Sequence, residues 1–409
     1  MSKRILVVTP WKRRWEMGGT AGVADDHYFI SGFTGGGYEV HYVSPRYDGS
    51  ADVPVENYFV HGFPNVLDAT EGWPSFLRRP LWPFLFTALA VRRALQVARR
   101  SPPSFVLGQT HLSAPAARIL AGRLRVPSAV KLFGVEDLDR TDWSRARYLR
   151  KNLEQILAFK VRQDAWIILD DGTGGADAAR RHGVSPERIR SLPNGVNLEW
   201  LRRAPDPDAR QAFDIPGDAT VVLFLSRLTA WKRPDLFIRA VPRILHERRR
   251  PVLFLIAGDG PMRHDCEALV ARLGLESAVR FLGPLPHERV PDLLSATSVL
   301  ASTNQRSSAG IPTCEAMVCG VPVVAFDVGG TRQVIRDRQT GRLVPEGDLE
   351  AFADAVAELL DDEEMRSSMG RRARAFAAES FTAWPDRVRM EVDIVEGLVS
   401  ARARLPQEG

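Results

Sequence analysis

The sequence predicts an α/β protein with two Rossmann-like, doubly wound domains that face each other across a cleft. Short apolar runs of strand length recur along the chain and are bounded by turn residues. Helix-length stretches separate most of these runs, which is typical of parallel sheets built from βαβ units. The chain has 409 residues, too many for one compact core, and its 44% hydrophobic and 26% charged content is ordinary for a globular protein.

Five apolar runs predict strands in the first half of the chain. They are RILVVTP (4–10), YEVHYVS (38–44), SFVLG (104–108), SAVKLF (128–133) and AWIIL (165–169). Helical patterns are expected over 114–125 and 145–163. These elements form the predicted N-terminal domain, residues 1–200.

The same alternation continues in the second half. Strands are expected at ATVVLFLS (219–226), PVLFLIAG (251–258), AVRFLG (278–283), SVLAST (298–303) and PVVAF (322–326). They define a predicted C-terminal domain, residues 205–384. Between the domains, residues 194–218 are rich in proline and aspartate and show no strand pattern, so we place the boundary near 200–215. Residues 383–405 predict one long amphipathic helix.

Composition restricts the setting of the protein. The three cysteines show neither zinc spacing nor a disulfide framework, which favours a reducing cytoplasm. The first residues lack the features of a signal peptide, and the apolar run 81–91 has half the length needed to cross a bilayer.

Charge is uneven, because the N-terminal half is basic although the net charge of the chain is only +5. Segment 73–100 combines aromatics, aliphatics and arginines. It predicts peripheral contact with an anionic membrane, or else a buried helix flanked by solvated arginines. Pro80 and Pro83 are expected to interrupt its helical pattern.

The phosphate-binding patterns of two large enzyme classes are absent. No GxxxxGK[ST] motif is present and no GxGxxG motif follows the first strand, which argues against a P-loop NTPase and a standard NAD enzyme. Instead, Gly18 and Gly19 lead into a predicted helix after the first strand. Such a loop lets backbone N–H groups approach an anion.

Cations and glycines follow the strands of the second half. Arg227 and Lys232 come directly after the strand 219–226, where a planar fork and a mobile ammonium group can both reach one diphosphate. Gly258 and Asp259 follow the next strand in the same way, and the glycine allows the backbone to crowd a ligand.

One lone acid stands in the otherwise small and apolar run SSAGIPTCEAM. Free N–H groups at Gly310 and Ile311, at the start of the expected helix, can bind a phosphate. Glu315, one turn further, can accept hydrogen bonds from a pair of ribose hydroxyls. Alternatively, Glu315 simply favours the helix dipole as an early acid.

These motifs occur in one order together with PERIRSLPNGVN and GIPTCEAMVCGVPVVAFDVGGTRQVIRDRQTGRLVP. The set resembles the retaining glycosyltransferases of family 4, which have the GT-B fold. The resemblance implies an N-terminal acceptor-binding domain, a C-terminal domain that binds a nucleotide-diphosphate sugar, and a last helix, about 385–409, that packs back on the N-terminal domain. The implied donor contacts are Arg227 and Lys232 to the diphosphate, Glu315 to the ribose, Gly310 and Ile311 as backbone donors, Leu282 and Gly283 near the base, and Gly19 from the first domain.

The chain departs from the family pattern at two positions. Ser307 stands where the first acid of E-x(7)-E, which contacts the donor sugar, is expected. Phe133 stands where the family often has a histidine. His111, Glu136, Asp137 and Asp171 are candidates to orient an acceptor hydroxyl, and each can equally be a turn or cap residue.

The implied reaction is transfer of a hexosyl unit to an acceptor hydroxyl with retention of configuration (EC 2.4.1.-), in the biosynthesis of a glycan, a lipid-linked saccharide or a glycoconjugate. No paired carboxylates are evident, so Arg227, Lys232 and helix amides are expected to stabilise the departing phosphate, which itself takes the acceptor proton. We expect no cofactor, no metal and no nucleic-acid partner, and an acceptor that is a glycan, lipid-linked or a small molecule. A UDP-sugar 2-epimerase of the same fold and a non-catalytic nucleotide-binding homologue remain as alternatives.

Overall fold

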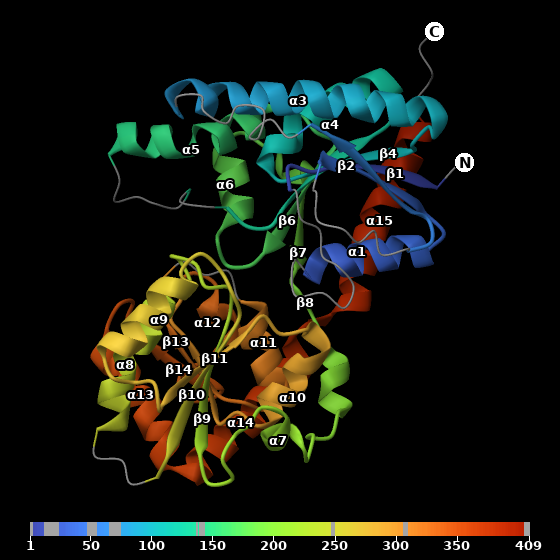
Figure 1. Ribbon diagram of the computed structural model, residues 1–409. Coiled ribbons are helices and arrows are strands. Elements are labelled where there is room, and N and C mark those ends of the chain that lie inside the picture. Colours follow the sequence, from blue (N-terminus) through green and yellow to red (C-terminus); the bar gives the residue numbers. More distant parts are fainter. Residues whose placement is uncertain are drawn as a thin grey trace. The chain divides into compact units, whose positions relative to one another are not determined.

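The computed structural model describes residues 3–11, 24–46, 55–64, 75–135, 138, 144–246, 250–305 and 310–404, with side chains for all of these except 24 and 75–80. The chain divides into two compact units. Unit 1 contains Met1–Pro193 and Pro385–Gly409, and unit 2 contains Asn194–Trp384. Each unit has its own parallel sheet with helices on both faces (Figure 1), which confirms the predicted class of two doubly wound α/β domains.

Unit 1 is built on a seven-stranded parallel sheet in the order β3-β2-β1-β4-β5-β6-β7. The five predicted strands are present as β1, β2, β4, β5 and β6, whereas β3 and β7 were not predicted. These two are the edge strands, and they are less buried than the strands between them. The strands are β1 Arg4–Val8, β2 Glu39–Pro45, β3 Tyr58–Phe63, β4 Phe105–Gln109, β5 Ser128–Leu132, β6 Ala165–Asp170 and β7 Ile189–Pro193.

Helices cover both faces of this sheet because successive strand residues point to opposite sides. Leu6 and Val8 of β1 pack with the helices of one face, and Ile5 and Val7 with those of the other. The first face carries α3 Ser75–Arg100, α4 Ala114–Leu124, α5 Arg145–Lys160 and α6 Gly175–Arg181, with short helices η1 His111–Ser113 and η2 Pro186–Arg188 nearby in sequence. The second carries α1 Ala24–Gly35 and α15 Trp384–Ala403.

The expectation that Pro80 and Pro83 interrupt the helical pattern is wrong, because α3 continues through both residues. Each proline removes one backbone donor, and both lie in the N-terminal half of a helix of 26 residues. The rest of α3 is held by buried side chains such as Phe86 and Ala94. No helix in the part of the chain that the structure describes is long and apolar enough to cross a membrane.

A cluster of buried charges holds α15 against unit 1. Lys131 of β5 lies 2.8 Å from Glu391 of α15 and also pairs with Asp25 of α1. Arg387, one turn before Glu391, donates to that carboxylate over 2.9 Å and lies 3.6 Å from Asp25. Lys131 and Arg387 are fully buried. Burial acts to raise the pKa of Glu391, but the two cations lower it overall.

Unit 2 contains a six-stranded parallel sheet in the order β11-β10-β9-β12-β13-β14. Five of its strands were predicted, and the edge strand β14 was not. The strands are β9 Thr220–Leu225, β10 Val252–Ala257, β11 Val279–Gly283, β12 Val299–Ser302, β13 Val323–Phe326 and β14 Gly341–Val344.

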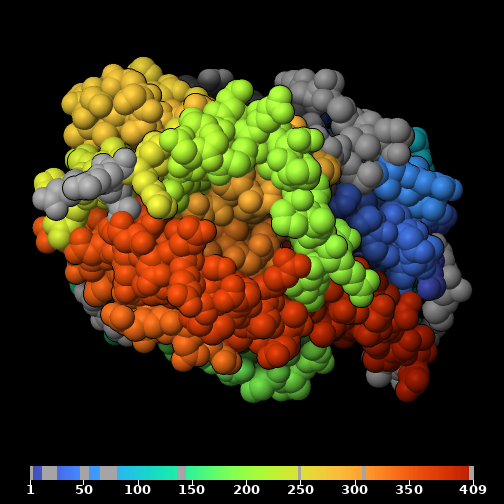
Figure 2. Space-filling view, turned by 90° about the horizontal axis from the view of Figure 1, so that it is seen from below, coloured from blue at the N-terminus to red at the C-terminus, as the bar shows by residue number. Residues whose placement is uncertain are grey.

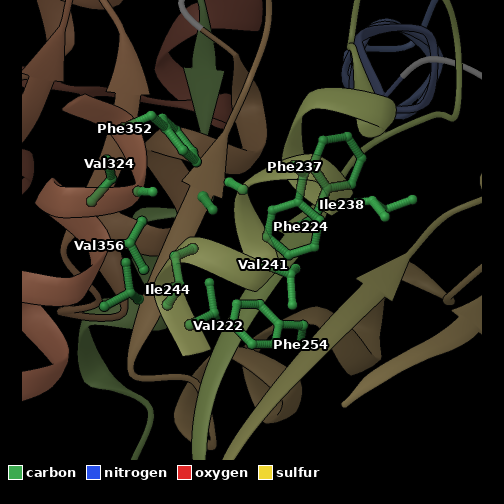
Figure 3. Close-up of a cluster of buried hydrophobic side chains, with 14 of the residues drawn as sticks. Val222, Phe224, Phe237, Ile238, Val241, Ile244, Phe254, Val324, Phe352 and Val356 are labelled. Carbon is green, nitrogen blue, oxygen red and sulfur yellow. The ribbon is translucent and has the colours of Figure 1, made fainter. Parts of the chain in front are cut away.

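Two buried clusters hold the helices of unit 2 on its sheet. Figure 3 shows one of them, in which Phe224, Phe237 and Phe254 pack between the sheet and α8, and Phe352 comes from α13. The other side of the sheet is covered by α10, α11 and α14. The helices are α8 Pro234–Leu245, α9 Arg263–Arg272, η4 His287–Arg289, α10 Val290–Ser295, α11 Ile311–Val318, α12 Thr331–Val334, α13 Leu349–Asp361 and α14 Glu363–Ser380.

Residues 194–218, expected to lack strands, contain β8 Gly195–Val196, which pairs with β15 Thr382–Ala383. The segment also forms η3 Leu198–Arg202 and α7 Ala209–Ala212. A Cβ at Gly195 would lie 2.1 Å from the ring of Trp384, so only glycine fits there. Figure 2 shows this segment in lime on the surface of unit 2, beside the orange and orange-red parts of the chain.

Candidate functional site

The candidate site of unit 2 lies where its two central strands separate. β9 and β12 pair at Val222–Val299 and Leu223–Leu300, and β9 then leads into α8 and on to β10, whereas β12 leads into α11 and on to β13. Such a reversal of strand order leaves a crevice at the carboxyl ends of the strands, where open α/β sheets bind ligands.

A small hollow that opens to solvent lies in this crevice. Polar groups reach it from both sides, with Ser226 and Lys232 on the β9 side and Asn304 and Thr313 on the β12 side. Its full lining is Phe224, Leu225, Ser226, Lys232, Leu300, Ala301, Ser302, Asn304, Gly310, Pro312 and Thr313.

Lys232 is the cation of this hollow. The hydroxyl of Thr303, which follows β12, donates to the backbone carbonyls of Lys232 and Arg233 over 3.2 and 2.7 Å, and this ties the two loops together. Burial lowers the pKa of Lys232, and the nearby charge of Arg227 lowers it further. Arg227 itself is exposed. The positive charges of Lys232 and Arg227 repel each other, so an anion that binds between them is stabilised.

The start of α11 faces the same hollow. Gly310 is the N-cap residue, and no side chain caps the helix. Pro312 stands at the second helical position and has no N–H group, so the backbone donors that remain at this helix start are those before it. A helix of eight residues with an uncapped start next to a lysine favours a bound anion.

Glu315 lies one turn further along α11 and is only 3% exposed. Its Oε1 atom lies 2.6 Å from Nε2 of His287, a hydrogen bond between α11 and η4. The ring of His287 in turn packs against Trp200 of η3, with 5.3 Å between the ring centroids. The lone acid therefore has a partner that comes from a different loop.

The Glu315–His287 contact shifts the pKa values of both side chains. Burial raises the pKa of Glu315, and the hydrogen bond from His287 opposes this rise. Burial acts to lower the pKa of His287, but its hydrogen bond with Glu315 and the charges of Glu315, Glu288 and Glu199 raise it overall. The pair therefore favours a proton held between the two groups.

The glycines after β10 and β11 bring two loops close to the site. The N–H of Gly258 donates to the carbonyl of Gly283 over 2.7 Å, and the N–H of Leu228 donates to the carbonyl of Asp259 over 2.9 Å. At Gly258 φ is +133°, and a Cβ there would lie 2.0 Å from the carbonyl oxygen of Ser226. The chain thus requires glycine at this position.

The described acceptor-side candidates follow three neighbouring strands of unit 1. His111 begins η1 after β4, and burial lowers its pKa to about 4. Phe133 follows β5 and packs against Trp11, with 4.9 Å between ring centroids. Asp171 follows β6 and accepts hydrogen bonds from the N–H and hydroxyl of Thr173 over 3.0 and 2.6 Å. Asp171 therefore organises its own turn, although burial raises its pKa.

Several predicted site residues lie outside the described residues: Gly18, Gly19, Glu136, Asp137 and Ser307. Within the described ranges, no group of three His, Cys, Asp or Glu side chains comes together in a way that could hold a metal ion. His287 was not predicted. The run PLPHERVP offers no local signal for it, because its partner Glu315 is 28 positions away in sequence.

Two family models match the chain. The model described as Glycosyltransferase Family 4 matches residues 27–200, and that described as Glycosyl transferases group 1 matches residues 205–376. A curated relative from Kribbella flavida, named D-inositol 3-phosphate glycosyltransferase, is 36% identical over 200 residues, or 47% of each chain. The chain thus spans about half the length of the curated relatives it matches.

Two solved structures show the same fold over almost the whole chain. Sucrose-phosphate synthase from Thermosynechococcus elongatus has a TM-score of 0.76 at 19% identity and covers 98% of this chain and 100% of its own. HepE from Anabaena, solved in complex with UDP-glucose, has a TM-score of 0.72 at 20% identity and covers 97% of this chain and 99% of its own. At these identities, the likeness concerns the fold.

Proposed function

The chain belongs to the family 4, group 1 glycosyltransferases with the GT-B fold, and from this premise we propose that it transfers a hexosyl unit from a nucleotide-diphosphate sugar to an acceptor hydroxyl with retention of configuration. One observation supports the proposal above the others. Lys232 and the uncapped start of α11 line one hollow at the carboxyl ends of β9 and β12. This combination suits a diphosphate.

The donor is proposed to lie across the carboxyl edge of the unit 2 sheet. Its diphosphate would lie between Lys232, Arg227 and the N–H groups of Gly310 and Ile311. The ribose would lie over Glu315, whose carboxylate accepts from both hydroxyls. The base would lie toward Leu282 and Gly283, which end β11 and are only partly buried. UDP is the first nucleotide to test, because HepE of the same fold was solved with UDP-glucose.

The proposed chemistry depends on stabilising the phosphate as it leaves. Charge develops on the bridging oxygen when the bond to the sugar breaks, and fixed donors act most strongly on such charge. Lys232 and the helix start are held before the donor arrives, because Thr303 fixes the lysine loop and Gly310 begins α11. The leaving oxygen would accept the proton of the acceptor hydroxyl on the same face of the sugar, so retention requires no protein nucleophile.

The acceptor is proposed to meet unit 1 near the ends of β4, β5 and β6. His111 has a pKa lowered to about 4 by burial, so its ring is neutral at pH 7 and can accept a hydrogen bond. Phe133 offers an aromatic surface where family members often have histidine. An acceptor panel should begin with inositol phosphates, because the curated relatives are named for D-inositol 3-phosphate, and should include glycans and lipid-linked saccharides.

We place the enzyme in the cytoplasm. Cys266 and Cys314 are buried free thiols, and Cys319 is also free. Free cysteines are usual in a reducing compartment and rare in oxidising ones.

Turnover of a donor panel tests the proposal. The chain is incubated with UDP-, GDP-, ADP- and dTDP-sugars and with each acceptor, and NMR follows the anomeric configuration of the product. We expect release of a nucleoside diphosphate and a retained linkage, abolished in Lys232→Ala and Arg227→Ala. Arg239→Ala is the matched control, because Arg239 is an exposed cation of α8 outside the hollow.

Three results would contradict the proposal. A UDP-sugar that changes its configuration at C2 without an acceptor would identify an epimerase instead. Tight nucleotide binding with no turnover across the panel would identify a binding protein. Full turnover in Lys232→Ala would show that the donor does not bind in this hollow.

A further inference from the structure

Large apolar side chains are exposed on neighbouring helices of unit 1. Phe84 of α3 is 75% exposed, Ile119 of α4 is 40% exposed and Leu157 of α5 is 56% exposed. The other exposed large apolar residues in the described part of the chain are scattered, as Phe59, Trp231, Leu273 and Met390. The gathered set is Leu81, Phe84 and Leu85 on α3, Ile119 on α4, and Leu149, Leu153 and Leu157 on α5. We call it the α3–α4–α5 face.

The three helices lie on the same side of the seven-stranded sheet. Phe86 of α3, Leu120 of α4 and Phe159 of α5 belong to one buried cluster. α4 packs beside α3 (Figure 1), and α5 packs on η1, the short helix that directly precedes α4. The inner sides of the helices are therefore used by the core, and the exposed residues lie on their outer sides.

The leucines of α5 show most clearly that the exposed apolar residues lie on the outer side of their helix. Leu149, Leu153 and Leu157 are spaced four apart, so they lie on one side of the helix. The opposite side already packs on the core through Ala158 and Phe159. α5 therefore has two apolar sides. One packs on the core of unit 1, and the other, with the three leucines, is exposed.

The charges among these apolar residues are almost all positive. Glu154 is the only acid that α4, α5 and the described side chains of α3 contain. The basic residues are Arg92, Arg93, Arg99 and Arg100 on α3, Arg118 and Arg123 on α4, and Arg145, Arg147, Arg150, Lys151 and Lys160 on α5. All of these except Arg93 are exposed.

We propose that the α3–α4–α5 face docks on the surface of an anionic lipid bilayer. Phe84 and the leucines would enter the boundary between headgroups and acyl chains, and the arginines and lysines would bind the anionic headgroups. The charge selects this occupant over a second copy of the chain, because two such faces would bring like charges together. Nucleic acid would match the charge but would leave the phenylalanine and leucines in water.

The docking is independent of the proposed glycosyl transfer, because it involves neither Lys232 nor the start of α11. The experiment is cosedimentation of the full chain with vesicles of phosphatidylcholine alone and of phosphatidylcholine mixed with phosphatidylglycerol. We expect binding to the mixed vesicles only, and binding that weakens as salt is added, because exposed charges are screened.

Two double variants separate the apolar from the electrostatic contribution. Leu153→Glu with Leu157→Glu replaces two exposed residues, so the fold is kept, and vesicle binding should fall more than about tenfold. Arg150→Ala with Lys160→Ala removes two charges beside these leucines. Binding should fall about fivefold for each, the factor that corresponds to ~1 kcal/mol per basic residue at an anionic surface. Leu273→Glu is the matched control, because Leu273 is 40% exposed and lies in unit 2.

Several outcomes would overturn the proposal. Absence of binding to the mixed vesicles is one, and equal binding to both vesicle types is another. Unchanged binding of the Leu153→Glu, Leu157→Glu variant would exclude the face itself. Sedimentation velocity tests whether a second copy of the chain binds the α3–α4–α5 face instead. A wild-type dimer that dissociates in the Leu153→Glu, Leu157→Glu variant would show that it does. Thermal melting of each variant confirms that it is folded.

Discussion

Replacing Glu315 by glutamine should weaken nucleotide binding while the chain stays folded. The carboxylate is 3% exposed and lies 2.6 Å from Nε2 of His287. Glutamine keeps the volume and one hydrogen bond to the imidazole, and it removes a buried charge. Because His287 can lose its proton once the carboxylate is gone, no unpaired buried charge remains, so we expect a melting temperature close to that of the wild type above the raised pKa of His287 and a lower one below pH 6.5.

The effect on the nucleotide is larger because a charged acceptor is lost from the proposed ribose contact. A hydrogen bond to a charged group contributes about 1.5–3 kcal/mol, so the affinity for UDP should fall roughly 10- to 150-fold. Calorimetric titration with UDP and with 2′-deoxy-UDP separates this contact from the diphosphate contacts. The wild-type chain should prefer UDP, and Glu315→Gln should lose most of that preference.

The matched control is Glu288→Gln, because Glu288 is an exposed acid next to His287 on η4. It should bind both nucleotides as the wild type does. Equal weakening of UDP and 2′-deoxy-UDP in Glu315→Gln, or no weakening of either, would refute the ribose contact.

Removal of His287 should make the affinity for UDP depend on pH. In His287→Ala the group that opposes the raised pKa of Glu315 is lost, so that pKa rises further and less carboxylate is ionised at pH 7. Affinity for UDP should be low near neutral pH and recover as the pH is raised. The wild-type pair also stabilises the fold below pH 6.5, the ordinary pKa of histidine, and this contribution is lost as the pH rises through the raised pKa of His287. A loss of affinity that is independent of pH would contradict this role.

Two further predictions concern unit 1. Lys131→Ala leaves two buried carboxylates without their main partner, so it should lower the free energy of unfolding of unit 1 by about 3–5 kcal/mol in urea denaturation. The exposed Lys160→Ala is the control and should change that free energy by about 0.5 kcal/mol or less. A loss below about 1 kcal/mol for Lys131→Ala would contradict the stabilising role of the buried charges. The lowered pKa of His111, about 4 against an ordinary 6.5, predicts that up to about 3 kcal/mol of stability is lost as the pH falls from 6.5 to 4. His111→Asn should flatten the pH profile of unfolding over that range, and an identical profile would contradict the lowered pKa of His111.

The central strands of both sheets could be predicted because they are buried on both faces and read as continuous apolar runs. The edge strand β11 was also predicted, whereas the edge strands β3, β7 and β14 were missed. In β3, YFVHGF, five of the six positions are partly or fully exposed, and in β14, GRLV, a glycine and the buried Arg342 leave an apolar run of only two residues. The pairing of β8 with β15 joins residues 195–196 to 382–383, and two residues give no periodic signal.

The residues around the hollow could be predicted for a geometric reason. Lys232 and Gly310 each follow a strand of one parallel sheet, and the carboxyl ends of parallel strands meet at the same edge. His287 and the buried charges could not be predicted in this way, because their partners come from elements far apart in sequence. A signal for the charges was present, since Lys131 interrupts an apolar strand and Arg387 and Glu391 lie four apart on one helix.

The claim that Lys232 and the start of α11 hold a nucleoside diphosphate is tested most directly by calorimetric titration of UDP into the wild-type chain, Lys232→Ala and the exposed-cation control Arg239→Ala. The account predicts one site per chain in the wild type and in Arg239→Ala. In Lys232→Ala it predicts affinity lower by roughly 10- to 100-fold, the range for loss of a charge-assisted contact. Equal affinity in Lys232→Ala and the wild type, or no binding of UDP, GDP, ADP or dTDP to the wild-type chain, would contradict it.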